Sequence, residues 1–295
     1  MTDRIIEVTE TGAFLRARNG LLVFQPKEGP EFTAPLPDLA ALVVAHPAAA
    51  LTAALIAQLA AAGGALVVCD ERRLPAAMLL PLVGHARQAE RFARQAEAPR
   101  PLRKRLWQAI VRAKLRSQAA LLGRLRGADP GLADLIPAVR SGDPDNCEAR
   151  GARLYWPALF ADPTFRREPR GGGLNAWLDY GYAVLRAATA RAICAAGLHP
   201  AFGLHHHNRY DPFCLADDLM EPFRPLVDEV VALLRSEGVP VELGREVKAR
   251  LLSPILGRVC LAGHERSVFE ALGRLAASLA QVYEGERRDL ALPDF

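Results

Sequence analysis

Residues 39–69 contain no Asp, Glu, Lys or Arg, so this stretch must be buried in a membrane or in a protein core. A transmembrane helix needs about 20 consecutive apolar residues, but His46-Pro47 and Gly63-Gly64 interrupt this stretch. Its longest unbroken piece, residues 48–62, is too short to span a bilayer and consists mainly of alanine, a good helix former. We therefore reject a membrane span and predict a buried helix that leads into a buried strand at 65–69.

The first 82 residues carry the patterns of β-strands. Residues 4–9 alternate apolar and polar side chains, which is typical of a half-buried strand. Asn19-Gly20 lies between two apolar runs, and this dipeptide is a strong hairpin signal. The apolar runs at 41–45 and 65–69 predict two buried strands. We expect a small β-rich N-terminal domain over residues 1–82, which is also our candidate for dimerisation.

From about Val83 the spacing of apolar residues becomes helical. Between positions 102 and 122 they recur three to five residues apart, with Arg and Lys between them. We expect further helices at 147–160, 174–196, 227–237, 247–256 and 265–284, and one that begins near Asp217. The predicted fold class is α+β: the β-rich N-terminal domain is followed by a larger all-α C-terminal domain over residues 83–295.

The distribution of charge indicates a polyanionic partner. The formal net charge is only +4, but residues 87–126 contain 12 Lys and Arg against two Glu. The rest of the chain is net acidic, and a basic strip on an otherwise acidic protein is typical of nucleic-acid binding. A solvated helix face is the competing interpretation of the same strip. Within it we expect Arg112 and Arg116 to contact DNA.

Cysteine usage and the first residues indicate the cellular compartment. The five cysteines are widely spaced and form no C-x-x-C pair, which argues against a disulfide scaffold or a zinc ribbon and favours a reducing environment. The chain starts with acidic residues where a signal peptide needs an apolar segment. We expect a cytoplasmic protein.

Three segments of the helical region carry side chains that could bind a metal ion. They are a glutamate at the start of an expected helix, a loop of three histidines and an asparagine, and an acidic segment at another helix start (Glu148; His205, His206, His207 and Asn208; Asp217, Asp218 and Glu221). Carboxylates with a neutral imidazole suit Mg²⁺ or Mn²⁺ better than a closed zinc site. A divalent ion beside a basic surface fits phosphodiester chemistry.

Each segment also has an alternative interpretation. Glu148 could complement a helix dipole, and Asp218 with Glu221 could form a capping box. The histidines could form a surface loop or the centre of a zinc hydrolase. If the acids are only caps, the protein is a non-catalytic Arg-rich nucleic-acid binding module.

The same segments resemble the CRISPR-associated spacer-acquisition integrase, a metal-dependent DNA endonuclease. The resemblance rests on residues 146–228: an Asn-x-Glu-Ala motif with Tyr155-Trp156, the run around Tyr180-Gly181-Tyr182, a His-His-x-Asn loop and the run Ala-Asp-Asp-Leu-Met-Glu-Pro-Phe-Arg-Pro. The His-His-x-Asn loop and the proline after Glu221 are similar to the type II branch. The family has an N-terminal β domain and a C-terminal α domain, which agrees with the predicted order.

The resemblance implies a site and a reaction. Glu148, His206 and Glu221 match the catalytic ligands of one Mg²⁺ or Mn²⁺ ion, and Asp218 is the alternative third ligand. Asp217, Asp218, His205 and Asn208 match positions that could orient the ion or its ligands. The implied reaction is the attack of a DNA 3′-hydroxyl on a phosphodiester of a CRISPR repeat, which inserts short foreign fragments into the array in antiviral defence.

The resemblance also implies partners. The protein would bind double-stranded DNA, as short fragments and as the CRISPR repeat, with backbone contacts from Arg166, Arg167, Arg170 and part of the basic strip. It would form a homodimer joined to a small second adaptation protein. In the type II branch, the effector nuclease and a ring-shaped accessory protein help to select fragments.

Overall fold

The computed structural model describes residues 4–9, 12–71, 75–81 and 84–294. The uncharged segment forms a strand, a helix and a second strand, as predicted: β5 (Leu39–Val44), α1 (Ala53–Ala61) and β7 (Ala65–Cys69). Every residue of β5 is buried. No helix within the described ranges is long and apolar enough to cross a membrane. The uncharged segment is therefore accommodated in the protein core.

β5 and β7 lie at the centre of a four-stranded sheet in the order β1-β5-β7-β8. β1 (Arg4–Val8) runs parallel to β5, β5 runs parallel to β7, and β8 (Pro75–Leu79) is antiparallel to β7. Parallel neighbours need long crossover connections. Three strands of the second sheet lie in the crossover from β1 to β5, and its fourth strand and α1 lie in the crossover from β5 to β7. β8 was not predicted, because its sequence begins with proline and is rich in alanine, both poor signals for a strand.

The second sheet has the order β4-β3-β2-β6 and contains the predicted hairpin. β2 (Phe14–Arg18) pairs antiparallel with β3 (Leu21–Gln25), and the turn residues Asn19 and Gly20 both have positive φ. This is the conformation that an Asn-Gly hairpin turn requires. β4 (Phe32–Pro35) and β6 (Ala50–Leu51) complete the sheet. Leucines of both sheets and of α1 form a shared apolar core.

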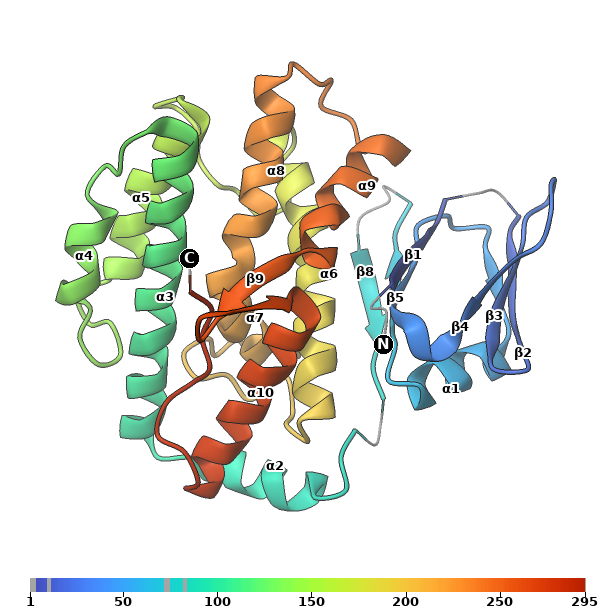
Figure 1. Cartoon of the computed structure of the whole chain (residues 1–295), viewed down its shortest axis with the longest axis horizontal. Coiled ribbons are helices and arrows are strands. Elements are labelled where there is room, and N and C mark those ends of the chain that lie inside the picture. Colours follow the sequence, from blue (N-terminus) through green and yellow to red (C-terminus); the bar gives the residue numbers. More distant parts are fainter. Residues whose placement is uncertain (1–3, 10–11, 72–74, 82–83, 295) are drawn as a thin grey trace.

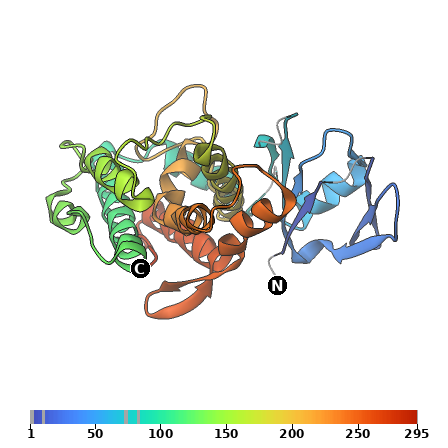
Figure 2. The same ribbon diagram turned by 90° about the horizontal axis from the view of Figure 1, so that it is seen from above.

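The helices follow the strands in sequence and lie beside them in space (Figure 1). α6 contacts the first sheet through β5, β7 and β8, and it also contacts α7, α8, α9 and α10. Figure 2 shows the two sheets of the N-terminal strands, with α1, at one end of the molecule and the later helices at the other. The fold is therefore a mixed α/β fold. The helices are α2 (Gln88–Ala96), α3 (Arg100–Arg126), α4 (Leu132–Ala138), α5 (Cys147–Phe160), α6 (Leu174–Ala195), α7 (Cys214–Met220), α8 (Arg224–Ser236), α9 (Arg245–Leu252) and α10 (Val268–Glu284).

The helical region is not all-α, and this part of the prediction is wrong. β9 (Arg258–Leu261) and β10 (His264–Ser267) form an antiparallel hairpin. Its turn residues Ala262 and Gly263 both have positive φ, and Ala gives no turn signal in the sequence. The helix predicted over 265–284 begins at Val268, where the Ser267 hydroxyl accepts a hydrogen bond from the Glu270 N–H. The predicted domain boundary between residues 82 and 83 lies outside the described residues.

A buried ion pair connects the first sheet to the helices. Lys248 of α9 is fully buried, and its Nζ lies 2.8 Å from Glu7 Oε1 on β1. The Tyr180 hydroxyl on α6 donates a hydrogen bond to the same oxygen at 2.9 Å. Three elements that are distant in sequence therefore meet at one carboxylate. Removing one partner of such a pair leaves an uncompensated buried charge.

We predict that Lys248→Met lowers the free energy of unfolding by about 3 kcal/mol, because Glu7 is left buried without its counter-charge. Urea denaturation measures this change. The double variant Glu7→Gln/Lys248→Met should recover much of the loss, since the amide oxygen still accepts from Tyr180. Arg250→Met, which removes an exposed pair on the same helix, is the control and should cost less than about 1 kcal/mol. A single variant no less stable than the double would contradict the prediction.

Candidate active site

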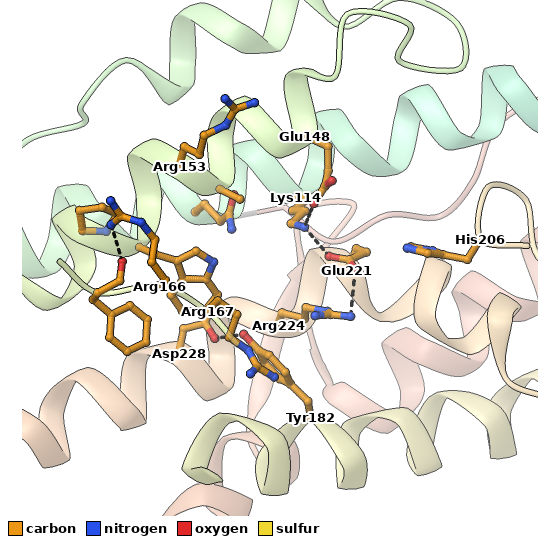
Figure 3. Close-up of a pocket in the computed structure, with 15 residues that line it drawn as sticks. Lys114, Glu148, Arg153, Arg166, Arg167, Tyr182, His206, Glu221, Arg224 and Asp228 are labelled. Atoms are coloured by element: carbon orange, nitrogen blue, oxygen red, sulfur yellow. Dashed lines mark hydrogen bonds and ion pairs between the residues drawn. The ribbon is translucent and has the colours of Figure 1, made fainter. Parts of the chain in front are cut away.

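A cavity of about 560 Å³ brings together all three predicted catalytic ligands. Its lining residues come from α3, α5, the loop after α5, α6, the histidine loop and the segment that joins α7 to α8 (Figure 3). Glu148, His206 and Glu221 all line it, although the chain separates the first from the last by some seventy positions. The cavity is the candidate active site.

Glu148 lies in the first turn of α5, and a different acid caps that helix. Asp143 accepts hydrogen bonds from the N–H groups of Cys147 and Glu148, at 2.8 and 2.9 Å. The helix N-terminus is therefore satisfied without the Glu148 side chain. The Glu148 carboxylate extends to the cavity and forms an ion pair with Lys114.

Glu221 lies where α7 passes into a short 3-10 turn, Glu221–Phe223, and is only 4% exposed. Arg224 pairs with its Oε1 at 3.0 Å, and Lys114 Nζ lies 2.7 Å from its Oε2. Oε2 is buried, and the Lys114 ammonium is its charged partner among the described residues. Burial raises the pKa of Glu221, but Arg224 and Lys114 outweigh burial and lower it overall.

Lys114 is the residue that sequence reasoning missed. It lies between the two carboxylates and is 7% exposed. Burial lowers the pKa of Lys114, but the charges of Glu221 and Glu148 outweigh burial and raise it overall. In the sequence it is one charge of the basic strip. The signal was its position seven residues after Trp107, on the apolar face of the helix.

Asp218 orients His206 and is neither a helix cap nor a lining residue of the cavity. α7 begins at Cys214, so Asp218 lies inside the helix, and the capping-box interpretation is wrong. Asp218 is fully buried, and its Oδ2 accepts the N–H groups of Leu204 and His205, at 2.6 and 3.0 Å. Its Oδ1 lies 2.6 Å from His206 Nδ1. Asp218 thus acts as the acceptor, which assigns a proton to Nδ1 and leaves Nε2 as the ring nitrogen that Asp218 does not hold.

The other members of the histidine loop and Asp217 do not line this cavity. His205 stacks on Trp107 with ring centroids 4.4 Å apart, and its ring is nearly perpendicular to that of His206. Asp217 pairs with Arg186 at 2.7 Å. Asn208 accepts the Tyr210 N–H in a turn. Because the consecutive imidazoles point in different directions, they do not form the predicted alternative of a zinc hydrolase centre.

The donor set fits a divalent ion in chemistry, but a cation of the protein lies between the donors. No group of three or more His, Cys, Asp or Glu side chains within the described part of the chain is close enough to hold a metal ion. The two carboxylates, of which Glu221 has a buried oxygen without a described hydrogen bond, and the imidazole are donor types that suit Mg²⁺ or Mn²⁺. Lys114 is the group that would have to move.

A buried carboxylate with two tyrosines lies at another side of the cavity. The Tyr155 hydroxyl donates to Asp228 Oδ2 at 2.8 Å, and the Tyr182 hydroxyl donates to Oδ1. Burial raises the pKa of Asp228 to about 6, against the effect of both hydroxyls. The Arg224 guanidinium carbon also lies over the Tyr182 ring, 4.8 Å from the ring centroid, in a cation–π contact. This network fixes α5, α6 and α8 around the site.

The predicted DNA-binding arginines lie in different places. Arg166 and Arg167 line the cavity, but Arg170 does not. Arg167 is held by Asp179 at 2.5 Å, whereas Arg166 donates only to backbone oxygens of its own loop. Arg112 is half-buried and donates to the Val139 carbonyl, and Arg116 is exposed. Neither of these two lines the cavity.

Comparison with known proteins finds relatives over the length of the chain. The family model for CRISPR associated protein Cas1 matches residues 6–241. The chain is 36% identical over 298 residues to the CRISPR-associated endonuclease Cas1 of Neisseria meningitidis serogroup C (strain 8013), which covers 100% of this chain and 97% of the relative. It is 30% identical over 245 residues to a CRISPR-associated endonuclease Cas1 of Pyrobaculum aerophilum, covering 79% and 83%.

Solved structures share the fold at low sequence identity. A casposase bound to its integration product has a TM-score of 0.82 and 18% identity, covering 98% of this chain and 93% of that one. A CAS1 protein from Thermotoga maritima has a TM-score of 0.76 and 14% identity, covering 97% and 99%. A Cas6-RT-Cas1–Cas2 complex has a TM-score of 0.78 and 15% identity, covering 99% of this chain and 36% of that one.

We predict that Asp228→Asn removes part of the pH dependence of stability. The pKa of Asp228 is raised from an ordinary value near 3.8 to about 6 in the folded protein. Its protonated form is thus favoured by folding, and this stabilisation is present below about pH 3.8 and lost as the pH rises through 6. Between pH 4 and 7 the wild type should lose up to about 3 kcal/mol more than the variant.

Urea denaturation across this pH range measures the difference between the two proteins. Asp134→Asn is the control, since Asp134 is an exposed acid at the start of α4. It should leave the pH dependence unchanged. Parallel stability curves for the wild type and Asp228→Asn would contradict the prediction.

Proposed function

The chain belongs to the Cas1 family of CRISPR-associated endonucleases, and we propose that it inserts short foreign DNA fragments into a CRISPR array by metal-dependent transesterification. One observation carries this proposal. Two carboxylates and an oriented imidazole, from three separate segments of the chain, line one cavity that also presents arginines to an anionic substrate. Such a site combines metal ligands with the positive charge that phosphodiester chemistry needs.

In the proposed mechanism, Glu148, Glu221 and His206 Nε2 hold one Mg²⁺ or Mn²⁺ ion. When bound, this ion lowers the pKa of the attacking 3′-hydroxyl and neutralises charge that develops on the phosphate. Asp218 keeps Nε2 directed away from its own carboxylate by holding Nδ1. Arg224 holds Glu221, and the Asp228 network holds the helices that carry the ligands.

Lys114 and the ion would compete for one place. Its ammonium compensates both carboxylates and lies where a cation shared by them would bind. Two cations cannot occupy that place, because like charges repel strongly at short range. Lys114 holds the two carboxylates in position without a metal, and it would have to move aside for Glu148 and Glu221 to hold the ion together.

Arginines would hold the DNA without reading its sequence. Arg166 and Arg167 at the cavity are proposed contacts to the phosphates beside the reacting bond, because guanidinium groups bind phosphate oxygens in pairs. Arg170, Arg112 and Arg116 are proposed contacts further along the backbone. Asp217, His205 and Asn208 would act only through their neighbours.

We propose the partners that the family implies. The Cas1–Cas2 complexes that share this fold support a small second adaptation protein of the Cas2 kind. A homodimer, the type II effector nuclease and its ring-shaped accessory protein are further proposed partners. We also propose that the strand-rich and helical regions act as two domains, with residues 1–82 as the dimerisation candidate.

We predict that Glu148→Gln reduces integration of a fluorescent DNA fragment into a supercoiled plasmid by at least about 100-fold, because one charged ligand is lost from the transition state. The assay contains Mg²⁺ or Mn²⁺ and the small partner, with chelator as a blank. Duplex binding should stay within a few fold of the wild type, since phosphate contacts carry it. Glu229→Gln, which removes a surface pair with Arg124, is the matched control. Unchanged integration by Glu148→Gln would favour the non-catalytic binding module instead.

We predict that Lys114→Met binds Mn²⁺ at least about tenfold more tightly than the wild type in the absence of DNA, because the competing ammonium is gone and two carboxylates are uncompensated. Isothermal titration calorimetry measures the affinity. Thermal melting gives a second readout: the variant should be less stable than the wild type without metal and should gain more from added Mn²⁺. Lys104→Met, an exposed lysine of the same helix, is the control. Equal or weaker Mn²⁺ binding by Lys114→Met would contradict the competition.

A further inference from the structure

A second cavity, of about 550 Å³, lies on the other side of the histidine loop. Three cations from the first two turns of α3 line it, together with a tryptophan and two members of that loop (Arg100, Arg103, Lys104, Trp107, His205 and His207). None of its described lining residues is acidic. The active-site cavity, in contrast, contains three carboxylates. The second cavity is therefore suited to an anion alone.

The cations of this cavity lack acidic partners among the described residues. Arg100, Arg103 and Lys104 form no ion pair with any residue that the structure describes, and Arg103 Nε is buried without a hydrogen-bond partner there. The next residue, Arg105, pairs with Asp289 and donates to the Arg288 carbonyl. Trp107 is 2% exposed, and its Nε1 likewise lacks a described partner. Donors that are partly or fully buried without partners indicate a missing acceptor.

Both cavities lie along one face of α3. The residues that line the second cavity precede Lys114 and Gln118, which line the first, at helical spacing. The histidine loop separates the two cavities, since His206 lines the first and His205 the second. Trp107 contacts both imidazoles, with its ring stacked on His205 and 5.7 Å from the centroid of His206. A ligand that extends along this face from the start of α3 passes the cations of the second cavity before it reaches the carboxylates of the first.

We propose that the second cavity binds a backbone phosphate of the same DNA strand whose reacting end lies in the active site. An α-helix rises about 1.5 Å per residue, so ten residues separate Lys104 from Lys114 by about 15 Å. A stacked strand advances about 3.4 Å per nucleotide, which places this phosphate about four nucleotides from the reacting end. The inference rests on the proposed function, because it takes DNA as the substrate of the first cavity.

Binding of DNA with single uncharged phosphates tests the proposal. The probe is a fluorescein-labelled duplex with 3′ single-stranded ends, carrying one methylphosphonate at positions one to eight from the 3′ end. Anisotropy is measured in chelator, so that no reaction contributes. For the wild type, we expect the methylphosphonate near position four to weaken binding about tenfold. The variant Arg103→Gln/Lys104→Gln should bind more weakly overall and be insensitive at that position alone.

Arg105→Gln is the matched control, because it removes the same charge from the same helix outside both cavities. It should keep the wild-type profile, and thermal melting should show that all variants are folded. A plot of log affinity against log salt concentration has a negative slope. In the double variant this slope should become shallower by about 0.7 for each lost contact to a single strand. A double variant with the full wild-type positional profile would overturn the proposal.

A free phosphate could bind the second cavity through the same contacts as a phosphate of the DNA backbone. Titration of inorganic phosphate and of a mononucleotide, followed by calorimetry, separates the two sources. Saturable binding of free phosphate that the double variant loses, with no sensitive position in the DNA, would overturn the assignment to DNA. A sensitive position together with no Mg²⁺- or Mn²⁺-dependent integration would overturn the proposed reaction and leave this phosphate site standing.

Discussion

The active site depends on the compensation of two acids by one buried lysine. Glu148 and Glu221 come from different helices, and Lys114 lies between them on a third. A carboxylate that is 4% exposed cannot remain charged in a protein interior without a partner. The ammonium therefore allows the two carboxylates to remain charged side by side. In the proposed reaction, the divalent ion takes over the same electrostatic role.

The rest of the site holds this charge cluster in register. Asp218 accepts two loop N–H groups and binds His206, so one buried carboxylate fixes both the path of the loop and the direction of the imidazole. Asp228 and its tyrosines join α5, α6 and α8. α3 continues past the site towards the second, purely cationic cavity. Residues of α3 therefore line both the candidate active site and the proposed binding site for the substrate backbone.

Local patterns predicted most of the elements, and the errors have local causes. The Asn19-Gly20 hairpin and α5 agree with the predictions because turn chemistry and helical spacing act within a few residues. The β9–β10 hairpin was not predicted because its Ala262-Gly263 turn lacks a typical signal, and the helix expected from residue 265 overlapped the end of β10. The capping box was a competing interpretation of Asp218 because Asp, Glu and Pro at this spacing also mark a helix start.

The sequence by itself determined the buried central strands, the helical character of the later residues, the basic strip and the identity of the three candidate ligands. Only the tertiary structure decided which charges meet. Lys114 is a strip residue in the sequence and a buried counter-ion in the fold, and Asp218 is a candidate ligand in the sequence and the support of His206 in the fold. The physical reason is that Coulomb and hydrogen-bond energies depend on distances of a few ångströms between side chains. The packing of α3, α5 and α7 sets those distances across more than a hundred positions of chain.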